Sequence, residues 1–295
     1  MSGVVAIVVC FFPNHRKLRA LIESIEQSVC EIILFNNGGF NALELNCTNL
    51  KIKVSSPGVN VGIGAALNAG CDLALAAGAR FAVTFDQDSA PDERMIPTLV
   101  DDILRYQNLD ERAIAIGPQL VDIRGGKNIV SPFQRFRRLG IERLSGNGVQ
   151  PVSQLITSGC LIDLKIWGDY NRFDDNLFID LIDHIWCWRM ARKGYIILGT
   201  TNTRMPHELS DEIKTTKGYS LTTYSATRRY YQVRNSFFHL LYEPLTWAQK
   251  FYMFRIIAAV VVSSILSDKK SIQSVGYCFS GFLDGITGKL GPYRK

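Results

Sequence analysis

Apolar positions along the first 120 residues follow two patterns that alternate with each other. Short runs of apolar and β-branched residues, such as residues 4–12 and 81–85, predict buried strands. The segments between such runs space apolar residues three and four positions apart, as at Leu18, Leu21 and Ile25, and predict helices. Strands that alternate with helices of this length are typical of βαβ units. The sequence therefore predicts a Rossmann-like α/β fold with a mostly parallel central sheet.

The pattern changes beyond residue 120. Residues 121–150 are polar and predict a long loop or irregular insert. SQLITSGCLIDL and YIILGT predict strands, LFIDLIDHIWCWRMARKG predicts a helix, and HELSDEIKTTKGYS predicts a loop. Two or three helices follow between Ala226 and about Leu283. We therefore divide the chain into residues 1–225 and a C-terminal helical region over 226–295.

Composition and charge narrow the class of partner. With 47% hydrophobic and 20% charged residues, the 295-residue chain has an ordinary globular composition. The formal net charge of +6 is uneven: from Lys214 onward there are 12 Lys and Arg against 3 Asp and Glu, so the part before it is slightly acidic. A basic end favours an anionic partner, which is a membrane surface, a phosphorylated substrate or nucleic acid.

Cysteine usage and the first residues predict a cytoplasmic protein. The seven cysteines form no C-x-x-C pair, which fits reduced core thiols. The stretch MSGVVAIVVCFFP lacks the positive region of a signal peptide and suits a first strand. The uncharged apolar run over 256–266 is too short to span a bilayer.

The stretch RFAVTFDQDSAP places Asp86 and Asp88 directly after the strand predicted over residues 81–85. Ligands of open parallel sheets bind at the carboxyl ends of strands, and two carboxylates there repel each other. A hard cation such as Mg²⁺ or Mn²⁺ removes the repulsion, because it binds one or two carboxylates and takes other ligands from water and phosphate. The alternative is a solvated acidic turn, with Asp88 capping the next segment.

A glycine-rich stretch, PGVNVGIGAALNAG, leads into a predicted helix whose N-terminus favours an anion. It is not a dinucleotide-binding fingerprint, because FFPN follows the first strand, and no G-x-x-x-x-G-K occurs. The alternative is a closely packed helix lined with Ala and Gly.

Several motifs occur together in a specific order: VVCFFPN, ILFNNGG, NVGIGAALNAG, FDQDS, SGCLID, LFIDLIDHIWCWRMARKGY, MPHELS and RRYYQVRNSFF. Over residues 4–242 the chain resembles family 2 glycosyltransferases with the A-type fold, and in particular their bacterial rhamnosyltransferase branch. The resemblance implies an inverting transfer from a nucleotide-sugar, dTDP-L-rhamnose, to a surface glycan of the O-antigen type. That glycan is carried on a polyprenyl diphosphate lipid at the inner face of the plasma membrane. Residues 1–225 are then the catalytic domain.

The resemblance also implies donor-side residues. Those for the nucleotide-sugar are Phe11, Pro13, Asn36, Asn60, Gly62, Asp86 and Arg234, and those for the metal are Asp86, Asp88 and His207. Alternatives stay open for several of them. Phe11 can be core, Asn36 replaces the usual aspartate and leaves the base undecided, and His207 suits a surface loop.

On the acceptor side, Asp183 aligns with the family's catalytic base, while Ile182 stands where a glutamate is usual. Asp180, three residues earlier, would share a helix face with it and is the second candidate. The alternative for both is a favourable charge at a helix N-terminus. Ser158 and Gly159 match the acceptor-side loop. We expect residues 121–150 and the C-terminal helices to shape the acceptor pocket.

The segment WAQKFYMFRIIAAVVVSSILSDKK combines aromatic and basic residues around an apolar stretch, which suits a helix in an anionic membrane interface. The alternative is a helix packed on the catalytic domain or across a homodimer contact. Two other functions remain alternatives. One is a transferase of the same fold with a UDP-hexose or UDP-N-acetylhexosamine donor, and the other is a non-catalytic adaptor at a membrane surface or on nucleic acid. No nucleic-acid recognition motif is present, so nucleic acid is not an expected partner.

Overall fold

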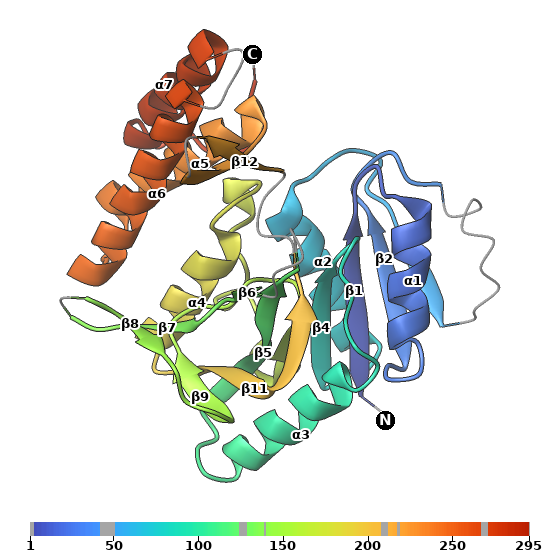
Figure 1. Ribbon diagram of the computed structural model, residues 1–295. Helices are drawn as coiled ribbons and strands as arrows, with labels where there is room; N and C mark the ends of the chain where they lie inside the picture. Colours follow the sequence, from blue (N-terminus) through green and yellow to red (C-terminus); the bar gives the residue numbers. More distant parts are fainter. Residues whose placement is uncertain are drawn as a thin grey trace. The chain divides into compact units, whose positions relative to one another are not determined.

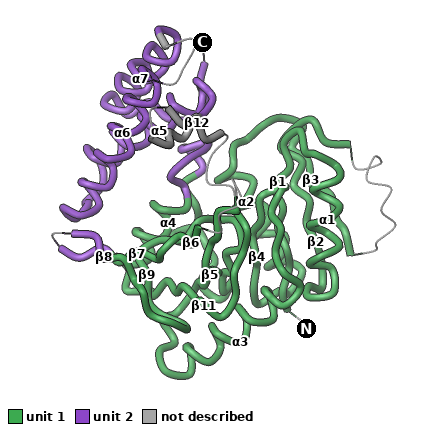
Figure 2. The backbone as a smooth tube through the Cα atoms, in the orientation of Figure 1, with its two compact units in different colours: residues 1–135, 143–174, 183–207 green, residues 136–142, 175–182, 208–295 purple. Residues whose placement is uncertain are grey.

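The structure is a computed structural model that describes residues 3–41, 51–123, 129–138, 140–207, 212–216, 219–266 and 271–294. The chain forms two compact units, coloured separately in Figure 2. Unit 1 comprises residues 1–135, 143–174 and 183–207, and unit 2 comprises 136–142, 175–182 and 208–295. Two stretches from the middle of the sequence therefore belong to the C-terminal unit. The predicted domain boundary at residue 225 stays a prediction.

A nine-stranded sheet is the centre of unit 1 (Figure 1), with the strand order β3-β2-β1-β4-β10-β5-β11-β9 and β6 paired to β5. Its strands are β1 (Val4–Cys10), β2 (Glu31–Asn36), β3 (Ile52–Ser55), β4 (Phe81–Asp86), β5 (Ala113–Asp122), β6 (Ile129–Val130), β9 (Val149–Val152), β10 (Cys160–Asp163) and β11 (Ile196–Pro206). Strands β1 to β4 are mutually parallel, as are β5 and β11. This confirms the predicted α/β fold.

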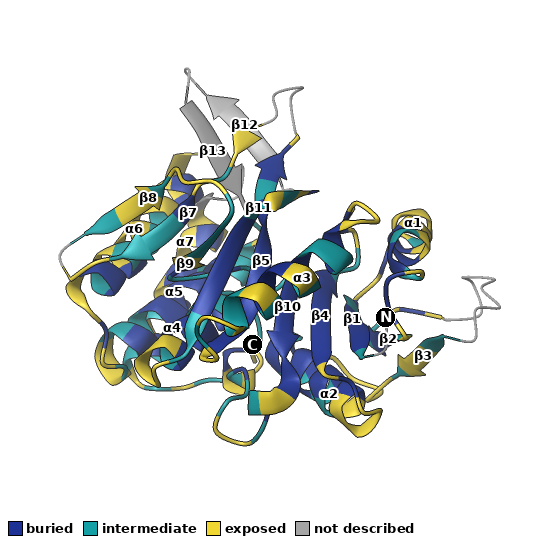
Figure 3. Cartoon of the chain, turned by 90° about the horizontal axis from the view of Figure 1, so that it is seen from below, coloured by how far each residue is buried: buried dark blue, intermediate teal, exposed yellow. Residues whose placement is uncertain are grey.

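Strand β10 runs antiparallel to both of its neighbours, β4 and β5. Because of this direction, the loop before β10 lies at the carboxyl end of β4. The central strands are mainly apolar, and Figure 3 shows β4, β5 and β10 buried over most of their residues. Burial on both faces is typical of a sheet covered by helices on both sides.

The helices are α1 (His15–Ile25), α2 (Ile63–Ala76), α3 (Met95–Gln107), α4 (Ile182–Arg192), α5 (Ala226–Tyr242), α6 (Trp247–Leu266) and α7 (Ser271–Ile286). Helix α1 begins after Asn14, whose side chain accepts hydrogen bonds from the N–H groups of Arg16 and Lys17 at 3.0 and 3.2 Å. This N-cap satisfies two donors that the helix itself leaves unpaired.

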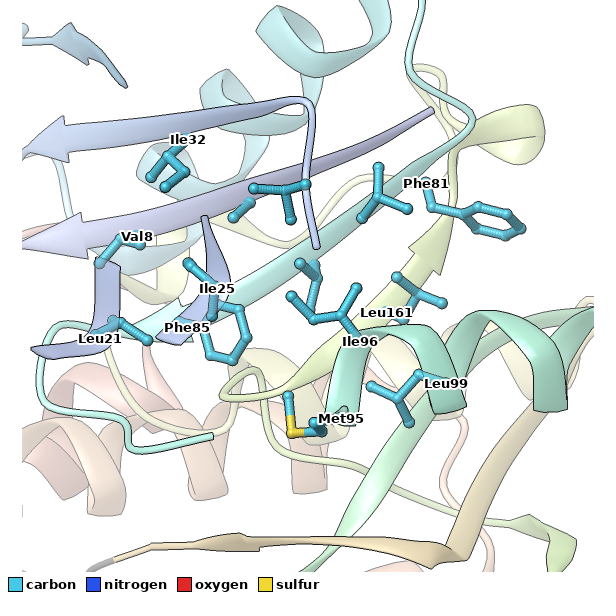
Figure 4. Close-up of a cluster of buried hydrophobic side chains, with 14 of the residues drawn as sticks. Val8, Leu21, Ile25, Ile32, Phe81, Phe85, Met95, Ile96, Leu99 and Leu161 are labelled. Atoms are coloured by element: carbon cyan, nitrogen blue, oxygen red, sulfur yellow. The ribbon is translucent and has the colours of Figure 1, made fainter. Parts of the chain in front are cut away.

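Helices α1 and α3 cover one face of the sheet. Figure 4 shows Leu21 and Ile25 of α1 and Ile96 of α3 packed against apolar residues of the strands, Phe85 among them. Helix α2 covers the opposite face, because Ile7 points away from this cluster and lies against Gly70 of α2.

Two predicted loops contain strands. The stretch 121–150 forms β7 (Phe133–Phe136) and β8 (Ile141–Leu144), which pair with each other, besides β6 and β9. The stretch after His207 contains the paired strands β12 (Glu212–Thr216) and β13 (Tyr219–Thr223). The loop predictions are wrong because strands of two to five residues show too little alternation, and pairing partners stabilise them instead.

Three helices, α5, α6 and α7, make up most of unit 2, as predicted. Helices α5 and α7 approach closely: a Cβ atom on Gly281 would lie 2.5 Å from the carbonyl oxygen of Tyr230, and one on Gly285 would lie 2.6 Å from that of Arg234. Two glycines one turn apart on α7 therefore bring the helix backbones into contact.

Helix α6 corrects an expectation about length. The uncharged run over 256–266 is too short to span a bilayer, but the helix begins at Trp247 and has 20 residues. Within the part of the chain that the structure describes, α6 has the length and composition to cross a membrane, a property it shares with core helices of soluble proteins. Only 28% of its most apolar window is buried.

Two helical glycines predict opposite effects on stability. In α2, a Cβ atom on Gly70 would lie 2.5 Å from Cγ2 of the buried Ile7. A Cβ atom on Gly276 in α7 would instead have no neighbouring atom within 4 Å. We expect Gly70→Ala to lower the free energy of unfolding by about 1–3 kcal/mol through overpacking. Gly276→Ala is the matched control and should raise it by up to about 1 kcal/mol through helix propensity. Urea unfolding followed by circular dichroism measures both. Equal effects in the two variants would contradict the packing of α2 on β1.

Candidate active site

The acidic pair lies where the sequence predicts it, at the carboxyl end of β4. Asp86 is the last residue of the strand, and the N–H of Ser89 donates to its carbonyl oxygen at 3.0 Å, which closes a tight turn. The side chain of Asp88 is half exposed, and Lys17 Nζ lies 3.9 Å from Asp88 Oδ2. An exposed pair at this distance contributes little to stability. The turn therefore leaves Asp88 accessible at the edge where ligands of such sheets bind.

Ser158 and Gly159 lie beside this turn, because β10 runs back along β4. Gly159 N–H donates to the carbonyl of Thr84 at 2.7 Å, and the hydroxyls of Ser158 and Ser89 are 2.6 Å apart. Gly159 has φ +78°, and a Cβ atom on it would lie 3.1 Å from the side chains of Met205 and Pro118. The structure thus brings the predicted acceptor-side residues together with the acidic turn, and glycine is required there.

Gln87, the middle residue of the acidic motif, fixes the turn to the end of β1. Its Oε1 accepts from Phe11 N–H at 2.7 Å, and its Nε2 donates to the carbonyl of Phe11 at 3.1 Å. Sequence reasoning missed this residue, whose signal is its place between Asp86 and Asp88. Phe11 and Phe12 are exposed, and Phe12 has φ +45°, whereas Pro13 is buried. Two aromatic rings, but not the proline, are therefore accessible at this edge.

Asn36, at the end of β2, is engaged within its own loop. Its Nδ2 donates to the carbonyl of Phe40 at 2.8 Å, and its Oδ1 accepts from Gly38 N–H at 3.1 Å. These bonds shape the turn after β2. A nucleobase contact would use the second lone pair of Oδ1.

Asn60 and Gly62 begin the helix that follows β3. Gly62 is the N-cap of α2 with φ +85°, and its N–H donates to Asn60 Oδ1 at 2.9 Å. The buried Asn37, which sequence reasoning also missed, accepts from Val61 N–H at 2.8 Å. The start of α2 is thereby held against the end of β2, and the only sequence signal for this contact is the NN pair in ILFNNGG.

Asp183 lies in the first turn of α4. Its Oδ1 accepts from the N–H of His184 at 2.8 Å and lies 3.6 Å from His184 Nδ1. The side chain of Asp183 keeps one fifth of its surface exposed. A carboxylate at a helix N-terminus is favoured by the macrodipole, and the remaining exposure allows contact with a ligand.

Asp180 does not share a helix face with Asp183, so that expectation is wrong. Helix α4 begins only at Ile182, because Phe178, Asp180 and Leu181 all have φ near +65°, in the left-handed region. Within unit 2, Arg228 Nη2 donates to Asp180 Oδ1 at 3.0 Å. Asp180 is therefore part of an ion pair in a strained segment of backbone.

Arg234 is fully buried in unit 2, which corrects its predicted role at the diphosphate. Its guanidinium donates to the carbonyls of Leu177 and Gly291 and to Oδ1 of Asn235, and its Cζ lies 4.8 Å from the ring centre of Tyr231. Burial lowers the pKa of Arg234. The planar donor fork that suits phosphate is used here to tie segment 175–182 to α5.

Asn235 holds the same segment. Its Nδ2 donates to the carbonyls of Ile179 and Asp180 at 2.8 and 2.9 Å. Because these bonds satisfy carbonyls of a strained turn, α5 stabilises the backbone that leads into α4.

His207 lies just beyond β11, where its N–H donates to the carbonyl of Val121 at 3.0 Å. Among the residues that the structure describes, His, Cys, Asp and Glu side chains form no group of three or more suited to a metal ion. The structure therefore does not place His207 with Asp86 and Asp88 in one ligand set.

The described cysteines are free thiols, as predicted, and five of the six are buried. Burial raises the pKa of Cys10 and of Cys187 to about 12. Such thiols stay protonated and unreactive at neutral pH.

The fold and this site define the class. A Rossmann-like, mostly parallel sheet carries D-x-D at the end of a central strand and a helical extension after it, which is the A-type glycosyltransferase fold. Comparisons with known proteins agree. The model of Glycosyl transferase family 2 matches residues 6–149. The dTDP-rhamnosyl transferase RfbF of Shigella flexneri is 27% identical over 300 residues, which cover 99% of this chain and 98% of that protein.

Solved structures support the fold. The crystal structure of S. aureus TarS 1–349 in complex with UDP-GlcNAc matches with a TM-score of 0.56 at 12% identity, over 96% of this chain and 81% of that one. TarS 1–349 without that ligand gives 0.51 at 14% identity, with the same coverage. The family match and the likeness to RfbF together support a family 2 glycosyltransferase, and the protein is an enzyme of the glycosyltransferase class.

The burial of Arg234 yields a test that separates a structural role from diphosphate binding. Lysine keeps the positive charge but cannot donate in a fork, so Arg234→Lys should lower the free energy of unfolding by about 2–3 kcal/mol. The affinity for dTDP and UDP, measured by calorimetry, should stay unchanged. Arg255→Lys, on the exposed face of α6, is the control and should alter neither quantity. A stable Arg234→Lys protein with weakened nucleotide binding would restore the diphosphate role.

Proposed function

We propose that the protein is an inverting, metal-dependent rhamnosyltransferase that moves L-rhamnose from dTDP-L-rhamnose to a lipid-linked surface polysaccharide of the O-antigen type. The observation that carries the proposal is the likeness to RfbF over the whole chain, together with the acidic turn at the end of β4. The UDP-GlcNAc complex of TarS supports a nucleotide-sugar as donor for this fold.

The residues at the acidic turn fit Mg²⁺ or Mn²⁺. Asp88 is accessible, Asp86 ends the adjacent strand, and such ions need only one or two carboxylates besides water and phosphate oxygens. Asp88 would bind the ion directly and Asp86 the ribose or a metal-bound water. When bound, the ion neutralises the diphosphate as a leaving group. Gln87 keeps the turn in register with the end of β1, so the carboxylates stay at that edge.

The donor nucleoside would lie over the ends of β1 and β2. The exposed ring of Phe11 offers a face for the base, while Asn36 and the Asn60–Gly62 turn form the floor beside it. Thymine and uracil present the same hydrogen-bonding edge and differ only in the C5 methyl group, so a contact with the Asn36 amide would not discriminate between them. A UDP-hexose or UDP-N-acetylhexosamine donor is for this reason the second candidate.

Asp183 is the proposed base. In a single displacement, an acceptor hydroxyl oxygen attacks the anomeric carbon and the bond from that carbon to the diphosphate oxygen breaks. The hydroxyl proton goes to the carboxylate of Asp183, and dTDP leaves. The attack comes from the face opposite to the leaving group, so the configuration inverts. General base catalysis of this kind contributes about 10²–10⁴-fold.

A donor panel tests the proposal. The protein is incubated with dTDP-L-rhamnose, UDP-glucose or UDP-N-acetylglucosamine and Mg²⁺, and released nucleoside diphosphate is measured. We expect the wild-type protein to turn over dTDP-L-rhamnose. The turnover of Asp183→Asn should be about 10²-fold or more below that of the wild type, at unchanged affinity for dTDP. Asp88→Asn should lose Mg²⁺-dependent dTDP binding.

Asp101→Asn, on the exposed side of α3, is the control. Turnover only with a UDP-sugar would select the second candidate, and full activity of Asp183→Asn would exclude it as the base.

The lipid-linked acceptor requires the enzyme to work at a membrane, and we propose that α6 and α7 lie on its anionic surface. The outward surface of the two helices is more apolar than that of a usual soluble helix pair, and serines join the apolar cluster in their interior. Serines lie between the helices: Ser264 Oγ is 3.4 Å from Cys278 Sγ, and Ser263 and Ser274 are also buried. The outward positions are apolar and exposed; they are Trp247, Phe251, Phe254, Val262, Ile265, Leu266, Ile272, Val275, Phe279 and Leu283.

The positive charges of α6 favour a helix that lies on the bilayer over one that crosses it. The exposed Arg255 is near the middle of α6, and Lys250 lies over the ring of Trp247 at 5.3 Å near its start. A spanning helix would place the guanidinium near the bilayer centre, at a cost of about 3 kcal/mol or more. A helix in the interface instead keeps the cations among anionic headgroups.

Vesicle sedimentation tests this surface. The protein should sediment with vesicles containing phosphatidylglycerol and much less with pure phosphatidylcholine, and salt should weaken binding. The double variant Phe251→Ser/Phe254→Ser should lose at least tenfold in partitioning. Leu109→Ser, at an even more exposed apolar site in unit 1, should not. If the double variant instead dissociates a dimer in sedimentation velocity, the outward face is an interface between two copies and the membrane proposal is wrong.

A further inference from the structure

Unit 1 contains a pocket distinct from the donor edge. It lies over β5 and is lined by Gly117, Pro118 and Leu120, by residues 131–134 and 154–156, and by Ser158 and His184. About 120 Å³ of it is open to water, which is room for on the order of ten water molecules or one sugar ring. We refer to it as the β5 pocket.

Two glycines lie beneath apolar side chains that line this pocket, and Gly117 is itself part of the lining. Gly117 of β5 and Gly199 of β11 are directly opposite each other in the parallel ladder. A Cβ atom on Gly199 would lie 2.6 Å from the ring of Phe133, and one on Gly117 would lie 2.9 Å from a methyl group of Leu155. Only bare backbone therefore lets these two apolar side chains lie flat on the sheet.

The lining indicates a neutral, hydroxyl-rich ligand. It contains no Lys, Arg, Asp or Glu, which excludes the cationic recognition that a diphosphate needs. It offers apolar surface from Phe133 and Leu155 beside two amides, a combination suited to a pyranose ring, whose faces are apolar and whose rim carries hydroxyls.

The two amides are arranged as a pair. Gln154 Nε2 donates to Gln134 Oε1 at 3.2 Å. Gln154 Oε1 is buried and has no hydrogen-bond partner within the described chain, and an unpaired buried acceptor is unfavourable. A ligand hydroxyl that reaches the pair would satisfy it, and the NH₂ group of Gln134 supplies a donor beside it.

The position of the pocket connects it to the chemistry. Its lining includes Ser158, which is hydrogen-bonded to Ser89 of the acidic turn. It also includes His184, the residue after Asp183 in α4. The pocket is therefore adjacent both to the turn that would hold the donor diphosphate and to the proposed base.

We infer that the β5 pocket is the acceptor subsite and that it takes an uncharged hexosyl residue, whose hydroxyls are read by Gln134 and Gln154. This inference rests on the proposed function. It assigns acceptor specificity to two amides, Gln134 within β7 and Gln154 just after β9.

The test uses p-nitrophenyl glycosides of glucose, galactose, N-acetylglucosamine, rhamnose and glucuronic acid as probes. Saturation-transfer NMR with dTDP and Mg²⁺ present should show binding of at least one neutral glycoside and none of the glucuronide. Gln154→Leu and Gln134→Leu should each weaken that binding about tenfold or more and raise the acceptor KM by a similar factor. The donor KM and the slow hydrolysis of donor without acceptor should stay at wild-type values. Gln150→Leu is the matched control, because Gln150 bonds to Gly146 outside the pocket.

The outcomes separate the two proposals. Wild-type glycoside binding in both Gln→Leu variants, with donor hydrolysis retained, would overturn the pocket assignment and leave the transferase function standing. Preferred binding of the glucuronide, or binding of no glycoside by the wild-type protein, would also overturn it. Glutamine-dependent glycoside binding without turnover of any nucleotide-sugar would instead support the pocket and refute the proposed function.

Discussion

The antiparallel pairing of β10 with β4 is the constraint on which the site of unit 1 depends. An all-parallel sheet would carry the chain away from the end of β4 through a crossover. Here the chain returns at that point, and Gly159 N–H bonds the carbonyl of Thr84 while Ser158 meets Ser89. One reversal of strand direction thus places acceptor-side groups against the acidic turn. Strand β10 also lies between β4 and β5 in the sheet. The loop before it contributes Ser158 to the β5 pocket, which is therefore next to the acidic turn.

Glycine residues and the side-chain amides of Asn and Gln fix the loops and strands around the site of unit 1 more than charged groups do. Gln87 ties the acidic turn to β1 through both atoms of its amide, and Asn37 holds the start of α2. Gly117 and Gly199 leave a flat strip of backbone for Phe133 and Leu155. Neutral groups can fix this geometry without competing for the proposed metal ion or the proposed donor diphosphate. The carboxylates of Asp88 and Asp183 keep part of their surface exposed, as ligand binding requires.

In unit 2, buried polar side chains hold a strained stretch of chain. Arg234 and Asn235 donate to carbonyls of segment 175–182, in which three residues have left-handed backbone conformations. Unpaired carbonyls in the interior would be unfavourable, so the hydrogen bonds from these two side chains stabilise the strained backbone of the segment. The helix that carries Asp183 starts directly after it. The outward faces of α6 and α7, in contrast, carry many exposed apolar side chains, which is the basis for the proposal that they lie on a bilayer.

The sequence by itself determined the α/β class, the alternation of elements up to β5, a C-terminal region of two or three helices, and the position of Asp86 and Asp88 at a strand end. These features follow from local periodicity and from the order of motifs, which a single chain displays directly. Only the tertiary structure decided that Arg234 is buried, that Asp180 is paired with Arg228 outside the helix of Asp183, and that residues 121–150 contain strands. An arginine between aromatic residues looks the same in sequence whether its partners are phosphates or carbonyls. Short edge strands, likewise, are stabilised by neighbours distant in the chain, so their residues alone do not specify them.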